Sequence, residues 1–181
     1  MTSNTNLSSI LQSTRCHNGQ SLAALTDETP VLIVFLRHAG CTFCREALSD
    51  LSVARNAIER RGVRLCLVHM GPESQAKPFI SEFGLGDVPR ISDPTRALYR
   101  AFGLERGRMR QLFGPTVIRR GMEAAAQGHG IGAMVGDGFQ MPGVFLIHHG
   151  KIVRAFRHET AADRPDYAAL ACDTPSQAAH A

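Results

Sequence analysis

The chain has 181 residues, of which 44% are hydrophobic and 20% are charged, and its net charge is +4. This composition predicts one ordinary globular domain over residues 1–181, long enough to bury a core without disulfide staples. No apolar run approaches the roughly 18 residues that cross a bilayer, and the N-terminus lacks the basic and apolar regions of a secretory signal. The arginines are scattered without interleaved aromatic residues, which argues against nucleic-acid binding. We therefore expect a cytoplasmic protein without membrane or nucleic-acid partners.

The first third of the chain predicts a loose start followed by a buried strand. Residues 1–14 are polar and rich in Ser, Thr and Asn, so they are expected to be frayed. A short amphipathic helix follows, with Leu22 and Leu25 on one side. Residues 31–36, V-L-I-V-F-L, form a continuous apolar run. Such a run is typical of a strand that is covered on both faces, as in a parallel sheet.

The middle of the chain repeats this pattern of helix and strand. From Cys41 the apolar residues recur at three- and four-residue steps, and Gly62 is a good C-terminal stop for the resulting helix. Residues 63–69, V-R-L-C-L-V-H, predict a second buried strand. Pro72 is suited to the first turn of a further helix that runs through Phe83.

A third strand and helix follow. Residues 88–94, V-P-R-I-S-D-P, form a short extended piece, in which Asp93 caps the next helix and Pro94 takes its first position. The order strand, helix, strand, helix, strand, helix predicts an α/β fold with a mixed, mainly parallel sheet flanked by helices. Residues 104–140 are predicted to be an insertion, helical at first and then Gly-rich.

The C-terminal part predicts a hairpin and a closing helix. Residues 143–148 and 151–157 are two apolar runs separated by His149-Gly150, which indicates a β-hairpin with a tight turn. Residues 164–171 predict a short helix, and the tail over 172–181 is expected to be loose.

The motif that carries chemistry is Cys41-x-x-Cys44, which directly follows a buried strand and opens a long helix. Unpaired backbone N–H groups and the positive end of the helix dipole stabilise a thiolate in the first helical turn. Thiols in such places have pKa values lowered from about 8.5 to roughly 3.5–7.5. The charged residues close to the motif in sequence are Arg37, His38, Arg45 and Glu46, of which only the last opposes a thiolate.

A metal site is the alternative interpretation of the same stretch. His38-x-x-Cys41-x-x-Cys44 has the spacing of half a site, and thiolate with imidazole suits zinc or iron. The residues that could complete four ligands are Cys16, His17 and His69. Because the chain has no second paired motif, we expect no metal and no cofactor.

The other cysteines are expected to act singly, since five is an odd number and argues against a disulfide framework. Cys66 lies in the middle of a predicted strand and is interpreted as an inert core thiol. Cys16 and Cys172 lie in the predicted loose ends and are interpreted as free surface cysteines.

Three stretches carry a resemblance to a known family: F-L-R-H-A-G-C-T-F-C-R-E, D-P-T-R-A-L-Y-R-A-F-G-L and G-D-G-F-Q-M-P-G-V-F-L-I. Over roughly residues 20–160 the chain resembles the thioredoxin-like superfamily. Within it, the chain is similar to the peroxiredoxin-like proteins of the AhpC/TSA group that carry a Cys-x-x-Cys. The resemblance implies a cis peptide between Met141 and Pro142, facing the active cysteines.

The resemblance leaves the roles of the two cysteines open. Peroxiredoxins carry a Pro seven residues and a Thr or Ser three residues before the attacking cysteine, and counted from Cys44 these positions hold Arg37 and Cys41. If the pair acts as in thioredoxins, Cys41 is the exposed nucleophile and Cys44 is the resolving thiol. If it acts as in peroxiredoxins, Cys44 attacks and Cys41 resolves. Thioredoxins have Gly-Pro between the cysteines, whereas here Thr42-Phe43 puts an aromatic ring beside the site, and we expect this ring to help bind a substrate or partner.

We therefore expect a thiol–disulfide oxidoreductase in which Cys41 and Cys44 cycle between dithiol and disulfide. The expected substrate is a peroxide or a protein disulfide, and the expected electron donor is a cellular thiol of the thioredoxin or glutathione type. Many relatives of this fold form homodimers. The alternatives are a redox sensor or binding module without turnover, switched by the same disulfide, and a metal-binding protein.

Overall fold

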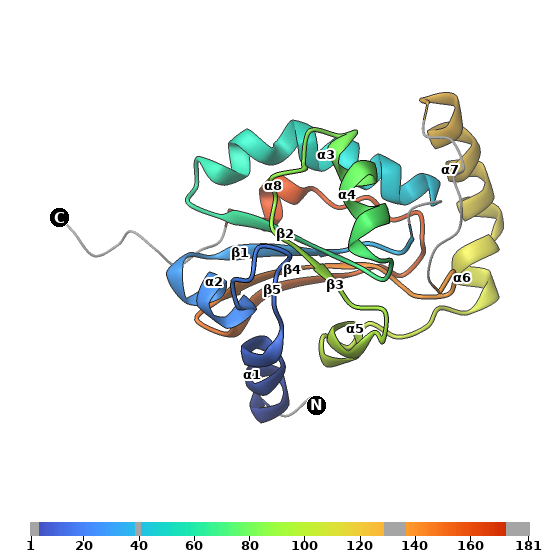
Figure 1. Cartoon of the computed structure of the whole chain (residues 1–181). Coiled ribbons are helices and arrows are strands. Elements are labelled where there is room, and N and C mark those ends of the chain that lie inside the picture. The colour runs from blue at the N-terminus through green and yellow to red at the C-terminus, as the bar shows by residue number, and fades with distance from the viewer. Residues whose placement is uncertain (1–3, 39–40, 129–136, 173–181) are drawn as a thin grey trace.

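A five-stranded mixed sheet forms the centre of the protein, and its strands lie in the order β3-β2-β1-β4-β5 (Figure 1). The computed structural model describes residues 4–38, 41–128 and 137–172. The strands are β1 (Val31–Phe35), β2 (Arg64–His69), β3 (Arg90–Ser92), β4 (Gly143–His148) and β5 (Lys151–Arg157). The pairs β1–β2 and β2–β3 are parallel, and β1–β4 and β4–β5 are antiparallel. The predicted mixed sheet is confirmed. It has two parallel and two antiparallel strand pairs instead of a parallel majority, because β4 lies antiparallel to β1 and continues as a hairpin into β5.

Helices cover both faces of this sheet (Figure 1). They are α1 (Asn4–Ser13), α2 (Leu22–Glu28), α3 (Thr42–Glu59), α4 (Glu73–Ser81), α5 (Ala97–Ala101), α6 (Met109–Phe113), α7 (Pro115–Ala126) and α8 (Tyr167–Leu170). Helices α1, α2 and α5 pack on one face, and α3, α4 and α8 on the other. Helix α7 packs against α3 and continues from α6. No helix in the described ranges is long and apolar enough to cross a membrane.

Strand β1 is apolar throughout because it is buried on both sides. Ile33 and Phe35 face the cluster beneath α1, α2 and α5, while Leu32 and Val34 face the cluster beneath α3, α4 and α8. All of these side chains are at most 2% exposed. The continuous apolar run therefore has its predicted cause, a central strand covered on two faces.

The N-terminal segment differs from the expected frayed end. Residues 4–13 form α1, in which Leu7 and Leu11 lie one helical turn apart and are buried against α2 and α5. Ser8, Ser9, Gln12 and Ser13 of the same helix are exposed. The expected loose C-terminal tail lies outside the described residues from position 173 onward.

Two helix boundaries differ from the expected ones for local reasons. Asp93 accepts the N–H groups of Ala97, Leu98 and Tyr99 instead of capping a helix that begins at once, and Arg96 precedes α5 with a left-handed φ of 60°. The helical part of the predicted insertion forms two helices, α6 and α7, which meet at Gly114, whose ψ is 161°. The residue before a proline disfavours helical backbone, which accounts for the break. The Gly-rich stretch over 129–136 lies outside the described residues.

Candidate active site

The two cysteines of the motif lie where β1 ends and α3 begins. Cys41 is the N-cap residue of α3, and Cys44 lies in its first turn. The side chains are 5% and 4% exposed, and both are free thiols. The predicted placement at a helix N-terminus is therefore observed, and it brings the thiols close to unpaired backbone N–H groups.

Arg37 contacts both thiols. Its Nη1 donates to the Sγ of Cys41 at 3.3 Å, and its backbone N–H donates to the Sγ of Cys44 at 3.2 Å. The residue is only 6% exposed. A buried guanidinium against a sulfur favours the thiolate at that sulfur, since little water screens its charge.

The pKa values of the two thiols are shifted in opposite directions by their surroundings. A hydrogen bond from the Cys44 thiol lowers the pKa of Cys41 to about 6. Burial opposes this shift, whereas the charge of Arg37 and two backbone N–H groups add to it. The same hydrogen bond, together with burial and the nearby Cys41 charge, raises the pKa of Cys44. At neutral pH the site therefore holds a Cys41 thiolate and a protonated Cys44. The geometry favours Cys41 as nucleophile, but it is buried rather than exposed because the Arg37 guanidinium lies against it.

The other charges of the motif are paired away from the thiols. Arg45 donates to Glu82 at 3.0 Å, so its positive charge is paired with a carboxylate and does not add to the field at the cysteines. Glu46 lies 3.3 Å from Arg120 and 3.4 Å from Arg164, and its side chain is 4% exposed. The carboxylate that was expected to oppose a thiolate is therefore neutralised by two arginines.

His38 does not supply the positive charge that was expected of it. Its Nδ1 is buried without a hydrogen-bond partner, and its backbone carbonyl accepts the N–H of Cys41 at 3.0 Å. Burial, and then the charge of Arg37, lower the pKa of His38 to about 4. The imidazole is therefore neutral at pH 7, and its effect on the site comes through the backbone.

Thr42 and Phe43 form the start of α3, as their sequence position predicts, and both are half-buried. The Phe43 ring packs against the core beneath α3 and against a smaller cluster that includes Leu112, Val117 and Met141. The ring also borders a small pocket with a cavity volume of about 20 Å³. It therefore lies near the dithiol, on the wall of a pocket that Arg37 also lines.

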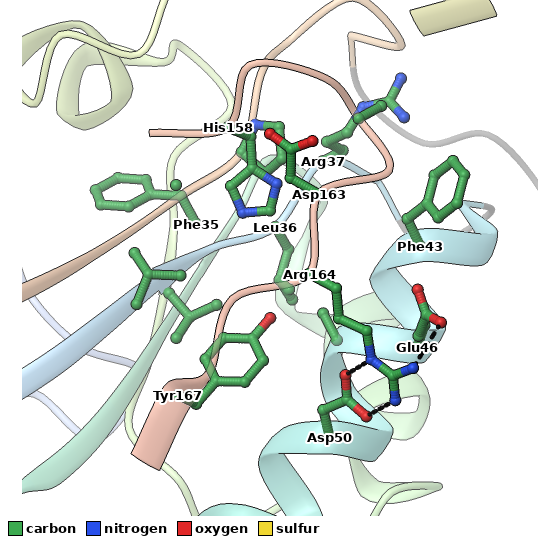
Figure 2. Close-up of a pocket in the computed structure, with 16 residues that line it drawn as sticks. Phe35, Leu36, Arg37, Phe43, Glu46, Asp50, His158, Asp163, Arg164 and Tyr167 are labelled. Carbon is green, nitrogen blue, oxygen red and sulfur yellow. Dashed lines mark hydrogen bonds and ion pairs between the residues drawn. The ribbon is translucent and has the colours of Figure 1, made fainter. Parts of the chain in front are cut away.

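Polar side chains from the C-terminal segment form the far wall of this pocket (Figure 2). Arg164 lies between the carboxylates of Glu46 and Asp50, and its Nε is 2.6 Å from Asp50. His158 also lines the pocket, and burial lowers its pKa to about 4. Sequence reasoning missed His158 and Arg164, since their segment carries no motif and gains its position only through tertiary packing.

The strand register brings Met141 and Pro142 to the site. Phe35 of β1 pairs with Gly143 of β4, so the preceding Pro142 lies next to the end of β1, and it lines the same pocket as Arg37. The Arg37 guanidinium extends this contact, since its Nε donates to the carbonyl of Gln140 at 3.2 Å and its Nη2 donates to that of Gly138. One side chain therefore ties the dithiol to the loop before β4.

The expected cis peptide between Met141 and Pro142 is wrong, since every peptide bond in the described residues is trans. The trans form of an X–Pro bond is favoured by about 0.5–1 kcal/mol unless packing selects the other. Here the loop is already fixed in the trans form by backbone hydrogen bonds, including that from the Met141 N–H to the carbonyl of Glu105 at 3.1 Å.

The residues proposed for a metal site do not all lie on one side of the sheet. Cys16 lies in the cluster beneath α1 and α2, on the opposite face of the sheet from Cys41 and Cys44. Across the described part of the chain, no group of three or more His, Cys, Asp or Glu side chains could hold a metal ion. Cys16 and His17 therefore cannot complete the half-site, because the sheet stands between them.

Comparison with curated proteins gives relatives of low identity. Human prostamide/prostaglandin F synthase is 27% identical over 150 residues, covering 78% of this chain and 73% of the relative. Human peroxiredoxin-like 2C is 28% identical over 110 residues, covering 50% of this chain and 48% of the relative. The chloroplastic thioredoxin-like protein AAED1 of Arabidopsis thaliana is 27% identical over 109 residues, covering 60% and 43%. The chain thus spans less than half the length of the latter two.

Solved structures share the fold. The bacterioferritin comigratory protein of Xanthomonas campestris superposes with a TM-score of 0.60 at 17% identity, covering 83% of both chains. A variant of Xylella fastidiosa PrxQ gives a TM-score of 0.61 at 15% identity, covering 89% of this chain and 86% of the other. At such identities the likeness concerns the fold, and it confirms the predicted thioredoxin-like architecture.

The AhpC/TSA antioxidant enzyme family matches residues 50–160. The match begins after Cys44, so it rests on the scaffold from the second half of α3 to the hairpin and leaves the role of the dithiol to the geometry described above. The matched stretch includes β2, the hairpin and the loop that Arg37 binds. On the agreement of this match with the fold, the chain belongs to the AhpC/TSA antioxidant enzyme family.

Proposed function

We propose that the protein is a thiol-dependent peroxidase in which Cys41 attacks the peroxide and Cys44 resolves the oxidised product. The observation that carries this proposal is the contact of the Arg37 Nη1 with the Cys41 Sγ at 3.3 Å, while the Arg37 backbone N–H holds Cys44. Membership in a family of antioxidant enzymes supports a peroxide-reducing role. The Xanthomonas campestris protein of the same fold is described by its alkyl peroxide reduction activity.

The first step uses the lowered pKa of Cys41. With a pKa of about 6, roughly 90% of this thiol is ionised at pH 7. The thiolate attacks one oxygen of the hydroperoxide, so that an S–O bond forms and the O–O bond breaks. The leaving alkoxide takes a proton from water and departs as an alcohol, which leaves Cys41 as a sulfenic acid.

In the second step Cys44 is the resolving thiol, and its raised pKa means that it brings a proton to the reaction. Its thiol keeps the proton at neutral pH and lies within hydrogen-bonding reach of the Cys41 sulfur. The Cys44 sulfur attacks the sulfenic sulfur, an S–S bond forms, and the hydroxyl leaves with the thiol proton as water. In sum, one hydroperoxide and two thiols give one alcohol, one water and one disulfide. Two thiol equivalents from a donor then restore the dithiol.

Burial of the thiols favours a small substrate over a protein disulfide. Cys41 and Cys44 are 5% and 4% exposed, so a folded protein surface meets little of either sulfur, whereas a peroxide group is small. Phe43 and Pro142 offer an apolar wall in the pocket that Arg37 also lines. A donor of the thioredoxin or glutathione type and a homodimer stay predictions, as does the cytoplasmic location.

Peroxide consumption under turnover with dithiothreitol tests the proposal. With dithiothreitol the native chain should consume many equivalents and Cys41→Ser should consume none. Without added thiol, Cys44→Ser should consume one equivalent and hold Cys41 as a sulfenic acid, whereas the native chain should consume one equivalent and form the disulfide. Cys172→Ser removes an exposed cysteine and serves as the matched control, with turnover unchanged. Turnover that survives both active-site substitutions would refute the proposal. Formation of a single disulfide without turnover would identify a redox sensor instead.

A further inference from the structure

A second pair of cysteines lies on the other face of the sheet. Cys16 is in the segment between α1 and α2, and Cys66 is in the middle of β2. Both are buried, at 4% and 0% exposure, in the cluster that includes Leu11 of α1 and Leu22 of α2. The expectation of a free surface thiol at Cys16 is therefore wrong, because α1 folds onto the sheet and carries the segment into the core.

Backbone hydrogen bonds fix Cys16 opposite Cys66. The N–H of His17 donates to the carbonyl of Arg90 at 2.8 Å, and the N–H of Arg90 donates to the Nδ1 of His17 at 3.2 Å. Arg90 of β3 is in turn the register partner of Leu67, the residue after Cys66. The segment that carries Cys16 therefore runs beside the edge of the sheet at the level of Cys66. The two thiols are hydrogen-bonded to each other.

We infer that Cys16 and Cys66 form a second redox-active dithiol, which hydrogen peroxide closes to a reversible disulfide that fastens the N-terminal helices to the sheet. The Cys16 sulfur attacks one oxygen of the peroxide, which breaks the O–O bond and releases hydroxide. The Cys66 sulfur then attacks the resulting sulfenic sulfur, and the released hydroxyl takes up the thiol proton. One hydrogen peroxide and two thiols thus give one disulfide and two waters, and two equivalents of an external thiol reverse the change.

Local acidity supports this order of events. The hydrogen bond from Cys66 lowers the pKa of Cys16, against the effect of burial, while the pKa of Cys66 is raised by the same bond and by burial. Cys16 is thus the better nucleophile and Cys66 the proton-bearing partner.

The inference goes beyond the proposed peroxidase and does not depend on it. The sheet separates this pair from Cys41 and Cys44, so neither pair can exchange with the other while the chain is folded. A disulfide between residues 16 and 66 encloses α2, β1 and α3, and it limits the freedom of the unfolded chain across that long loop.

The test uses a full-length variant with Cys41→Ser, Cys44→Ser and Cys172→Ser, which retains only Cys16 and Cys66 among the five cysteines. The protein is treated with hydrogen peroxide, alkylated with N-ethylmaleimide, and digested with trypsin without reduction. The expected product joins the peptide over 16–37 to the peptide over 65–90, and dithiothreitol separates them. The oxidised protein should also melt several degrees higher than the reduced one.

Two further arms make the outcome unambiguous. Adding Cys66→Ser to the same background should abolish the linked peptide and leave Cys16 to accumulate as sulfenic and sulfinic acid. The native chain, which carries no substitution that affects folding, must yield the same linked peptide. If both thiols of the native chain are alkylated after peroxide treatment, or if Cys16 is overoxidised while Cys66 stays free, the inference is overturned. Loss of peroxide turnover at Cys41 leaves this result unaffected, so the two proposals fail separately.

Discussion

Replacing Arg37 with glutamine is expected to raise the pKa of Cys41. The guanidinium donates to the Cys41 sulfur at 3.3 Å from a position that is 6% exposed. Arg37→Gln keeps a polar side chain but removes the positive charge that stabilises the thiolate. The helix N-terminus and the hydrogen bond from Cys44 remain, so the pKa should shift only part of the way back to an ordinary thiol value.

The size of this shift follows from the contact. A hydrogen bond to a charged group contributes about 1.5–3 kcal/mol, and one pKa unit corresponds to about 1.4 kcal/mol. The full Coulomb attraction at 3.3 Å with an effective dielectric constant of 20 is about 5 kcal/mol, which is an upper bound. The pKa of Cys41 should therefore rise from about 6 to about 7–8. The ionised fraction at pH 7 should fall from about 90% to between about 10% and 50%.

The assay is the rate of iodoacetamide alkylation against pH, with Cys41 identified by mass spectrometry. Alkylation of the native chain should reach half its maximal rate near pH 6, and Arg37→Gln should move this midpoint upward by about one to two units. Arg45→Gln is the matched control, since it also removes one arginine charge close to the motif in sequence, at the start of α3, but from a guanidinium bound to Glu82. An unshifted midpoint in Arg37→Gln, or an equal shift in both variants, would refute the reasoning.

Three further predictions concern stability. Arg90→Leu should lower the unfolding free energy by about 2–4 kcal/mol in urea, since Arg90 is 1% exposed and bonded to Glu73 and the Gly86 carbonyl, and an unchanged midpoint would contradict this. Tyr99→Phe should cost about 1–2 kcal/mol in the same assay, because its hydroxyl donates to two strand-end carbonyls. Burial lowers the pKa of His158 to about 4, so only the unfolded chain takes up its proton between about pH 6.5 and 4, and native stability falls across that window. His158→Asn should make that acid-induced fall shallower, and an unaltered pH slope would count against the argument.

The core of the site could be predicted because its signals are local. The apolar run of β1, the helical period after Cys41 and the thiol spacing lie within one stretch of sequence, and each is set by neighbouring residues. The hairpin of β4 and β5 was equally accessible, since His149 and Gly150 adopt the positive φ values of 48° and 67° that such a two-residue turn requires.

The electrostatics of the site could not be predicted, because charge in the sequence carries no direction. Arg37, Arg45 and Glu46 all lie within a few residues of the cysteines, yet only Arg37 contacts a thiol. Its other partners, Gly138 and Gln140, are separated from it by 101 and 103 residues. Contacts at such separation depend on the pairing of β1 with β4, which local patterns do not specify.

The N-terminal region shows a different limit. Its composition is polar, and the two leucines that bury α1 form too short a pattern to outweigh that composition. If α1 is not predicted, Cys16 is assigned to a free end of the chain, and Cys66 is assigned no second cysteine as a neighbour. One helix of ten residues therefore changes the interpretation of two cysteines.

The contact between Arg37 and Cys41 has a consequence for the reduction potential of the dithiol. Oxidation to the disulfide removes the thiolate and leaves the buried guanidinium with only the loop carbonyls as partners. At pH 7, lowering the pKa of one thiol from 9.0 to about 6 stabilises the reduced form by about 1.4 kcal/mol, whereas Cys44 stays protonated and adds nothing. For a two-electron couple this corresponds to a potential about 30 mV more oxidising. The hydrogen bond from Cys44 and the charge of Arg37 together produce this shift. In the proposed cycle they make the disulfide easier to reduce, so that a milder thiol donor is sufficient.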